Sequence, residues 1–155
     1  MTRRTVICDL DGTLASNLWR QRFVTSAPKD WTTFFLLARF DAPIPDTLAR
    51  LRSEAATFDI CIVTGRPADY RDLTESWLAK HSVPYSELLM RPSTDWESDH
   101  VTKRGIHSKH LERRDIAYAL DDRDDTIALW RELGIQVHKV RDPGVAPILT
   151  PAKLD

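Results

Sequence analysis

The chain has 155 residues, of which 42% are hydrophobic and 29% are charged, a balance that excludes an intrinsically disordered chain. This length suits one domain with a single sizeable core. Because 22 basic residues nearly cancel 23 acidic ones, the formal net charge is -1, which excludes binding of nucleic acid through an overall positive field.

The apolar stretches of the chain are short. The N-terminal run MTRRTVICDLDG reaches an aspartate before an apolar stretch of signal-peptide length, and no later stretch approaches the length of a membrane span. Cys8 and Cys61 fall in apolar runs that we interpret as buried strands, which favours reduced core thiols over a disulfide. We therefore expect a cytoplasmic protein that makes no membrane contact.

Apolar runs rich in strand-forming residues alternate with segments of helical periodicity along most of the chain. In chain order, the pattern predicts a strand at 5–10, a helix at 45–55, a strand at 58–65, a helix at 67–81, a strand at 86–90, a polar helix at 98–114, a strand at 116–120, a helix at 122–133 and a strand at 135–140. Pro45 and Asp46 open the first of these helices, and Gly134 closes the last. This alternation predicts an α/β fold with a central parallel sheet flanked by helices on both faces.

Two segments stand outside this alternation, within a single predicted domain over residues 1–155. We interpret residues 14–43 as a small cap insertion and residues 141–155, which proline punctuates, as an extended C-terminal tail. The insertion is rich in aromatic side chains, namely Trp19, Phe23, Trp31, Phe34, Phe35 and Phe40. Such residues usually form the core of a cap, and stacking on nucleobases is the alternative, with Trp19 beside Arg20 as its best candidate.

The first predicted strand runs into VICDLDGTLA, where two carboxylates stand one residue apart. Two like charges this close are costly unless a positive group lies between them. Polar residues at the carboxyl ends of parallel strands converge on one edge of the sheet. Here they are Asp9 and Asp11, Thr64-Gly65-Arg66, Asp121-Asp122-Arg123, and Lys103 after a loop. Acidic oxygens at this density favour a hard cation such as Mg²⁺ together with a phosphate.

The same residues carry a family resemblance. DLDGT, the threonine in IVTGR, a downstream lysine and ALDDR resemble, in order, the four motifs of the haloacid dehalogenase (HAD) superfamily of phosphotransferases. The finer pattern looks like the 3′-phosphatase domain of polynucleotide kinase/phosphatase. Asp99 to Lys103 forms D-x-x-x-K, Arg66 directly follows TG, DDR occupies 121–123, and Arg20 stands eleven positions beyond Asp9. The resemblance implies a Rossmann-like HAD fold with a small cap.

The resemblance also implies a role for each position. Asp9 would be the nucleophile that forms an aspartyl-phosphate, and Asp11 the acid and base that exchanges protons with the leaving oxygen and with water. Thr64 and Lys103 would grip the phosphoryl group, and Asp121 completes the predicted catalytic set. The predicted substrate-binding residues are Gly12, Thr13, Arg20, Gly65, Arg66, Asp99 and Arg123.

Mg²⁺ is the implied cofactor. Its expected ligands are the carboxylates of Asp9 and Asp122 and the backbone carbonyl of Asp11, while Asp121 remains open as a replacement for Asp122 or as a support behind it. Lys109 is the alternative to Lys103, which is favoured because the D-x-x-x-K spacing places an aspartate on its helical face. Surface ion pairs are the alternative for Arg66 and Arg123.

The function implied is Mg²⁺-dependent removal of a 3′-phosphate from a DNA or RNA end or a nucleotide, with a 2′,3′-cyclic phosphate as an additional candidate substrate. The five glycines form no G-x-x-x-x-G-K-[ST] loop, so kinase activity is not expected from these residues, and a separate kinase or ligase in the same pathway is left open. Two alternatives stand beside this function. One is a small-molecule HAD phosphatase acting on nucleoside monophosphates, and the other is a catalytically silent HAD-like domain that binds a partner.

Overall fold

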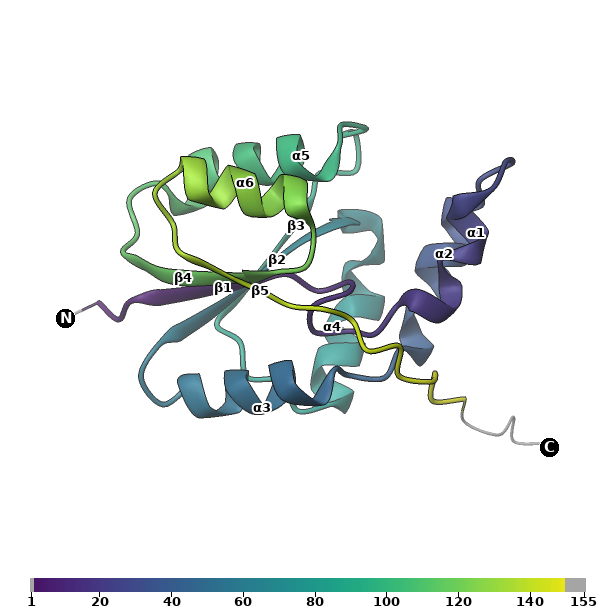
Figure 1. The fold of residues 1–155 in the computed structure, drawn as a ribbon, viewed down its shortest axis with the longest axis horizontal. Helices are drawn as coiled ribbons and strands as arrows, with labels where there is room; N and C mark the ends of the chain where they lie inside the picture. Colours follow the sequence, from purple (N-terminus) through teal and green to yellow (C-terminus); the bar gives the residue numbers. More distant parts are fainter. Residues whose placement is uncertain (1, 150–155) are drawn as a thin grey trace.

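Five parallel strands form the centre of the computed structural model, which describes residues 2–149. Their order is β3-β2-β1-β4-β5 (Figure 1). The strands are β1 (Thr5–Cys8), β2 (Asp59–Pro67), β3 (Glu87–Arg91), β4 (Ile116–Asp121) and β5 (Val137–Lys139). Because β2 and β4 flank β1, the carboxyl ends of all three strands meet at one edge, where ligands bind in open parallel sheets.

Helices cover both faces of this sheet. The helices α3 (Pro45–Glu54) and α4 (Arg71–Lys80) lie on one face, and α5 (Asp99–Ile106) and α6 (Asp124–Glu132) lie on the other (Figure 1). Short turns extend two of them: η3 (Ala68–Tyr70) precedes α4, and the π-helical turn η4 (His107–Leu111) follows α5. The predicted α/β fold with a central parallel sheet flanked by helices is therefore confirmed.

The strands divide their side chains between two hydrophobic clusters because successive residues point to opposite faces of a sheet. Val6 of β1 and Ile60 of β2 pack in the cluster that holds Trp77 of α4. Ile7 and its neighbours pack in the other, which holds Trp130 of α6. Cys8 and Cys61 are free and buried in these two clusters.

The cap segment (residues 14–43) contains four short helical elements between β1 and α3. They are η1 (Leu18–Arg20), α1 (Arg22–Thr25), α2 (Trp31–Leu36) and η2 (Leu37–Phe40), and α1 and α2 project beyond the end of the sheet (Figure 1). That this segment acts as a cap stays a prediction.

The tail binds the cap segment along residues 141–149, which have no regular secondary structure. Asp142 accepts hydrogen bonds from the Ser16 hydroxyl at 2.6 Å and the Asn17 amide at 2.8 Å. The Ile148 amide donates to the Phe40 carbonyl at 2.8 Å. Residues 150–155 of the predicted tail lie outside the described residues.

Several boundaries differ from the sequence prediction by one or more residues, and three of these differences involve the ends of a strand and two helices. The strand predicted at 5–10 ends at Cys8, because the Leu10 carbonyl accepts the amides of Thr13, Leu14 and Ala15 in a tight turn. The helix predicted at 67–81 begins as α-helix only at Arg71, and the one predicted at 98–114 changes to π-helical bonding after Ile106.

Among residues 2–149, no helix combines the length and the apolar character that crossing a membrane requires. The cytoplasmic location stays a prediction.

Candidate active site

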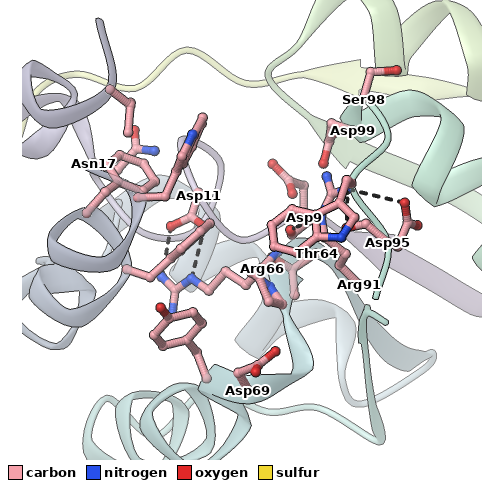
Figure 2. A pocket seen from close by; sticks show the side chains of 18 of the residues that line it. Asp9, Asp11, Asn17, Thr64, Arg66, Asp69, Arg91, Asp95, Ser98 and Asp99 are labelled. Carbon is pink, nitrogen blue, oxygen red and sulfur yellow. Dashed lines mark hydrogen bonds and ion pairs between the residues drawn. The ribbon is translucent and has the colours of Figure 1, made fainter. Parts of the chain in front are cut away.

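The carboxyl ends of β1, β2 and β4 open into a cleft of about 620 Å³ that the cap segment borders. Its lining includes Asp9 and Asp11 after β1, Thr64 of β2 and Asp122 after β4, with aromatic side chains of the cap segment opposite. Figure 2 shows Asp9 and Thr64 near its centre, and Asp11 joined to Arg66. Residues predicted from three separate strand ends, among them Asp9, Thr64 and Asp122, thus line one cavity.

Lys103 lies fully buried among three carboxylates. Its Nζ atom is 2.9 Å from Asp9 Oδ1, 3.0 Å from Asp121 Oδ2 and 3.2 Å from Asp99 Oδ2. Burial lowers the pKa of a lysine, but these carboxylates, Asp9 foremost, outweigh it and raise the pKa of Lys103 well above its ordinary value. Burial raises the pKa of Asp9, and Lys103 opposes that effect. Lys103 is therefore an ammonium ion that fixes the Asp9 carboxyl group.

Asp11 is held by two guanidinium groups. Arg66 donates from Nε to Asp11 Oδ2 at 2.9 Å and from Nη2 to Oδ1 at 2.8 Å, and Arg20 donates to the same Oδ1. Burial would raise the pKa of Asp11, but Arg66 and then Arg20 outweigh it and hold that pKa well below its ordinary value. In this arrangement Asp11 is an ionised carboxylate and a weak base, because its two arginine partners favour the charged form.

Arg20 is fully buried and is not among the cleft-lining residues, although the sequence predicted it to bind substrate. Its Nε and Nη2 atoms donate to Asp41, and Nη1 donates to the Phe34 carbonyl. The structure therefore places Arg20 behind Asp11, away from the cavity surface.

Asp41 was not predicted as a site residue. Its fully buried carboxylate also accepts from Trp19 Nε1 at 2.8 Å, so the Trp19 indole nitrogen faces Asp41, and Trp19 is not among the cleft-lining residues. No sequence motif marks Asp41. Its contacts with Arg20 form only when the cap segment folds, so motif spacing could not predict them.

Three carboxylates could hold a metal ion. One oxygen from each of Asp9, Asp121 and Asp122 lies within 4.8 Å of the others. Thr13 Oγ1 lies 3.1 Å from both Asp9 Oδ2 and Asp122 Oδ1, so its single hydroxyl proton can be donated to either carboxylate. Burial raises the pKa of Asp122, and the nearby Asp121 carboxylate adds to this increase. An oxygen-only set of this kind, with Asp9 and Asp121 buried and Asp122 half-buried, suits a hard divalent cation.

Comparison with known proteins identifies a family whose members share this type of domain. The family model for the phosphatase domain of the polynucleotide kinase PNKP matches residues 3–144. The chain belongs to this family. The PNKP phosphatase domain is a HAD-type phosphatase, so the resemblance in the sequence is confirmed.

Two similar proteins are longer than this PNKP-type domain. A protein of Autographa californica nuclear polyhedrosis virus, provisionally named a bifunctional polynucleotide kinase/RNA ligase, is 26% identical over 136 residues, which are 85% of this chain and 18% of the viral protein. The structure of a Pnkp1/Rnl/Hen1 complex contains a chain that is 28% identical with a TM-score of 0.77, covering 90% of this chain and 46% of that one. The chain thus spans less than half the length of both.

The HAD fold itself also appears in more distant structures. The L-2-haloacid dehalogenase PA0810 has a TM-score of 0.60 at 14% identity, over 96% of this chain and 91% of its own. At this identity the likeness shows the fold alone.

The remaining predicted positions of the PNKP-type domain surround these groups. The Thr64 hydroxyl lies in the cleft and accepts from the Arg66 amide at 3.1 Å. Gly65 has the Asp99 carboxylate directly against its α-carbon, where a β-carbon would collide with it. Arg123 also lines the cleft, but it pairs with Asp125 at 3.0 Å and its side chain is half exposed.

Gly12 permits the close packing of the β1 turn on Asp122. Its φ of +82° favours glycine, and a β-carbon built there would stand 2.5 Å from Asp122 Oδ2. We expect Gly12→Ala to lower phosphatase kcat/KM by about 10-fold to 100-fold, because Asp122 must move away from Asp9. Backbone strain should also lower the free energy of unfolding by about 1–2 kcal/mol.

Gly134→Ala is the matched control for this substitution. Gly134 has a similar φ of +78°, and nothing lies near the β-carbon that alanine would add. It should lose similar stability in urea unfolding while keeping wild-type kcat/KM. Equal activity of the two variants would show that Gly12 serves the turn and not the position of Asp122.

Proposed function

We propose that this chain is a Mg²⁺-dependent phosphatase that removes the 3′-phosphate from polynucleotide ends, with a 2′,3′-cyclic phosphate as a further candidate substrate. The observation that carries the proposal is the Asp9 carboxylate, which lines the cleft and is held by Lys103 at 2.9 Å in a PNKP-type phosphatase domain. An exposed acid would be free to rotate, whereas this one is fixed toward the cavity in which a phosphate fits.

The first chemical step forms an aspartyl-phosphate on Asp9. A carboxylate oxygen of Asp9 attacks phosphorus while the bond from phosphorus to the 3′-oxygen of the sugar breaks. The leaving oxygen takes a proton from Asp11, which must first gain it, and that requires the contacts from Arg66 and Arg20 to weaken when phosphate arrives. Lys103 and the Thr64 hydroxyl stabilise the negative charge that builds on the phosphoryl oxygens.

The second step hydrolyses the aspartyl-phosphate. Water attacks phosphorus, its proton passes to Asp11, the acyl-phosphate bond breaks, and inorganic phosphate leaves with Asp9 regenerated. The carboxylate form in which Asp11 is held here is the form that this step needs. Asp99 is 3.2 Å from Lys103 and keeps its ammonium directed at the site throughout.

Mg²⁺ fits the acidic set, with Asp9, Asp122 and the Asp11 backbone carbonyl as its proposed ligands. When bound, the ion offsets the repulsion between a carboxylate and a phosphate dianion. Asp122 is favoured over Asp121 because the Asp121 carboxylate already accepts from Lys103, Trp130 Nε1 and the amides of residues 122 and 123. Asp121 then holds Lys103 from behind.

The backbone and side chains around this centre form the proposed phosphate-binding set. Gly12 and Thr13 shape the turn after Asp9, and the Arg66 amide donates to the Thr64 hydroxyl at 3.1 Å. Arg66 and Arg123 are the cations that line the same cavity and could reach a phosphate oxygen.

A nucleoside monophosphatase is the second candidate function. The charge of the cleft favours a mononucleotide substrate. Carboxylates outnumber guanidinium groups in its lining, so a long phosphate backbone would find few cations to bind. The complete set of Asp9, Asp11 and Lys103 counts against a silent binding domain.

An activity panel tests the proposal. We expect the purified protein to release phosphate from 3′-phosphorylated DNA or RNA oligonucleotides with higher kcat/KM than from 5′-phosphorylated ends or 3′-nucleoside monophosphates. EDTA should abolish release, and added Mg²⁺ should restore it. Preference for mononucleotides would favour the second candidate, and no release from any ester would favour the silent domain.

The names of the similar proteins suggest companions for this activity. One pairs a polynucleotide kinase with an RNA ligase, and the other is a complex of Pnkp1, Rnl and Hen1. We propose that a kinase or ligase acts in the same end-repair sequence, since a 3′-hydroxyl end is what a phosphatase of this kind would supply.

A further inference from the structure

Trp96 is 91% exposed and lines the active-site cleft. Tryptophan is usually among the more buried residues of a protein, because its large apolar surface gains free energy on leaving water. The neighbouring residues Asp95, Glu97 and Ser98 also line the cleft, so the loop between β3 and α5 forms one of its walls. An exposed tryptophan in the lining of the active-site cleft can contact a bound ligand.

The loop that carries Trp96 is braced on both sides of it. Arg91 Nη1 donates to the carbonyl of Glu97 at 2.6 Å and contacts that of Asp95 at 3.5 Å. The Asp95 carboxylate accepts from the Glu97 amide at 2.9 Å and from the Thr102 hydroxyl at 2.8 Å. The backbone is thereby fixed with the indole outside, so the exposure of Trp96 is built into the loop.

The same arginine connects this loop to the phosphate-binding strand end. Arg91 Nε donates to the Gly65 carbonyl at 2.7 Å, one residue beyond Thr64. Arg91 and Asp95 are both labelled beside Asp99 and Thr64 in Figure 2. The distance from the phosphate site to the base of the Trp96 loop is therefore set by a direct hydrogen bond.

The cap segment supplies the other aromatic wall. Trp31 is 49% exposed, lines the cleft and stacks on Phe35 with ring centroids 5.9 Å apart. Phe35 in turn lies 5.0 Å from the ring of Tyr70. The rings of this cluster pack on one another, whereas Trp96 is 91% exposed.

Charge in the cleft argues against recognition through further phosphates. Its guanidinium groups are those of Arg66, Arg91 and Arg123, and each already binds protein acceptors. Carboxylates outnumber them in the lining. A flat, uncharged nucleobase suits an exposed indole in such surroundings, because stacking needs no positive charge.

We propose that Trp96 is a specificity-determining residue that stacks on the nucleobase of the nucleotide carrying the 3′-phosphate. This inference rests on the proposed function and deepens it: the cleft recognises the terminal nucleotide by its base. Stacking is made equally in the ground state and the transition state, so Trp96 should lower KM and leave kcat nearly unchanged.

The test compares two substrates that differ only in the terminal base. One is a short oligonucleotide that ends in a 3′-phosphorylated nucleotide, and the other carries a tetrahydrofuran abasic residue with the same 3′-phosphate. We expect Trp96→Ala to lower kcat/KM by about 10-fold to 100-fold on the first, through KM, and to change it little on the second. Trp96→Phe should retain most of the activity, and the wild-type protein should itself prefer the substrate with the base.

Tyr85→Ala is the matched control, since Tyr85 is also exposed but is not among the cleft-lining residues, and it should leave both substrates unaffected. Equal losses on the two substrates, or no loss on either, would overturn the stacking role and leave the proposed function standing. If the wild-type protein hydrolyses neither oligonucleotide, the proposed function and this inference both fall.

Discussion

Asp9→Asn is expected to lower phosphatase kcat by roughly 10³-fold or more, because the amide cannot attack phosphorus and form the acyl-phosphate. The fold should survive the change. Burial raises the pKa of Asp9, which means that its surroundings penalise the charged form and accept a neutral group of the same shape. Lys103 keeps the carboxylates of Asp121 and Asp99 as partners. We therefore expect the free energy of unfolding to change by about 1 kcal/mol or less.

Asp115→Asn is the control for the loss of a carboxylate in general. Asp115 is exposed, pairs with Arg4 at 2.9 Å and stands before β4, at the edge of the sheet opposite the cleft. Phosphate release, thermal unfolding and circular dichroism would be measured for both variants. Unaltered turnover in Asp9→Asn would end the assignment of the nucleophile, and a change in Asp115→Asn would point to a global effect of charge.

The strands of the sheet were predictable because the residues in each of them have a high intrinsic preference for strands. The runs VIC, ICIV and IAYAL are apolar and rich in strand formers, and they form β1, β2 and β4. Strand ends in a parallel sheet share one edge, so the placement of Asp9, Thr64 and Asp122 in one cleft followed from the order of elements alone. The choice of Lys103 over Lys109 rested on helical spacing, and the structure buries the first and exposes the second.

The parts of the site outside the sheet were not predictable in this way. Asp41 belongs to no periodic pattern. Its hydrogen bonds with Arg20 form because the fold of the cap segment brings these two residues together. Arg91 directly follows the strand predicted at 86–90 and carried no prediction, yet its guanidinium fixes the loop that presents Trp96. Such contacts join side chains to distant carbonyls and carboxylates, and neither hydrophobic periodicity nor motif spacing records them.

The second large effect concerns stability. Lys103→Met should lower the free energy of unfolding near pH 7 by about 3–5 kcal/mol when EDTA is present, because it leaves the carboxylates of Asp9, Asp121 and Asp99 close together without the ammonium between them. In the wild-type protein the pKa of Lys103 is raised, so its contribution is complete below the ordinary lysine pKa and is lost only as pH rises through the folded value.

The pH dependence of this loss separates electrostatics from packing. Burial already raises the pKa of Asp9, and removal of the ammonium raises it further, so the folded variant binds a proton that the unfolded chain releases. A carboxyl group with a raised folded pKa contributes stability at low pH and loses it as pH rises, so the deficit of Lys103→Met should shrink from pH 7 toward pH 5. Urea unfolding at both pH values measures this, with exposed Lys109→Met as the control expected to match wild type. A deficit that is equal at the two pH values would mean that the methylene stem of Lys103, and not its charge, holds this part of the structure together.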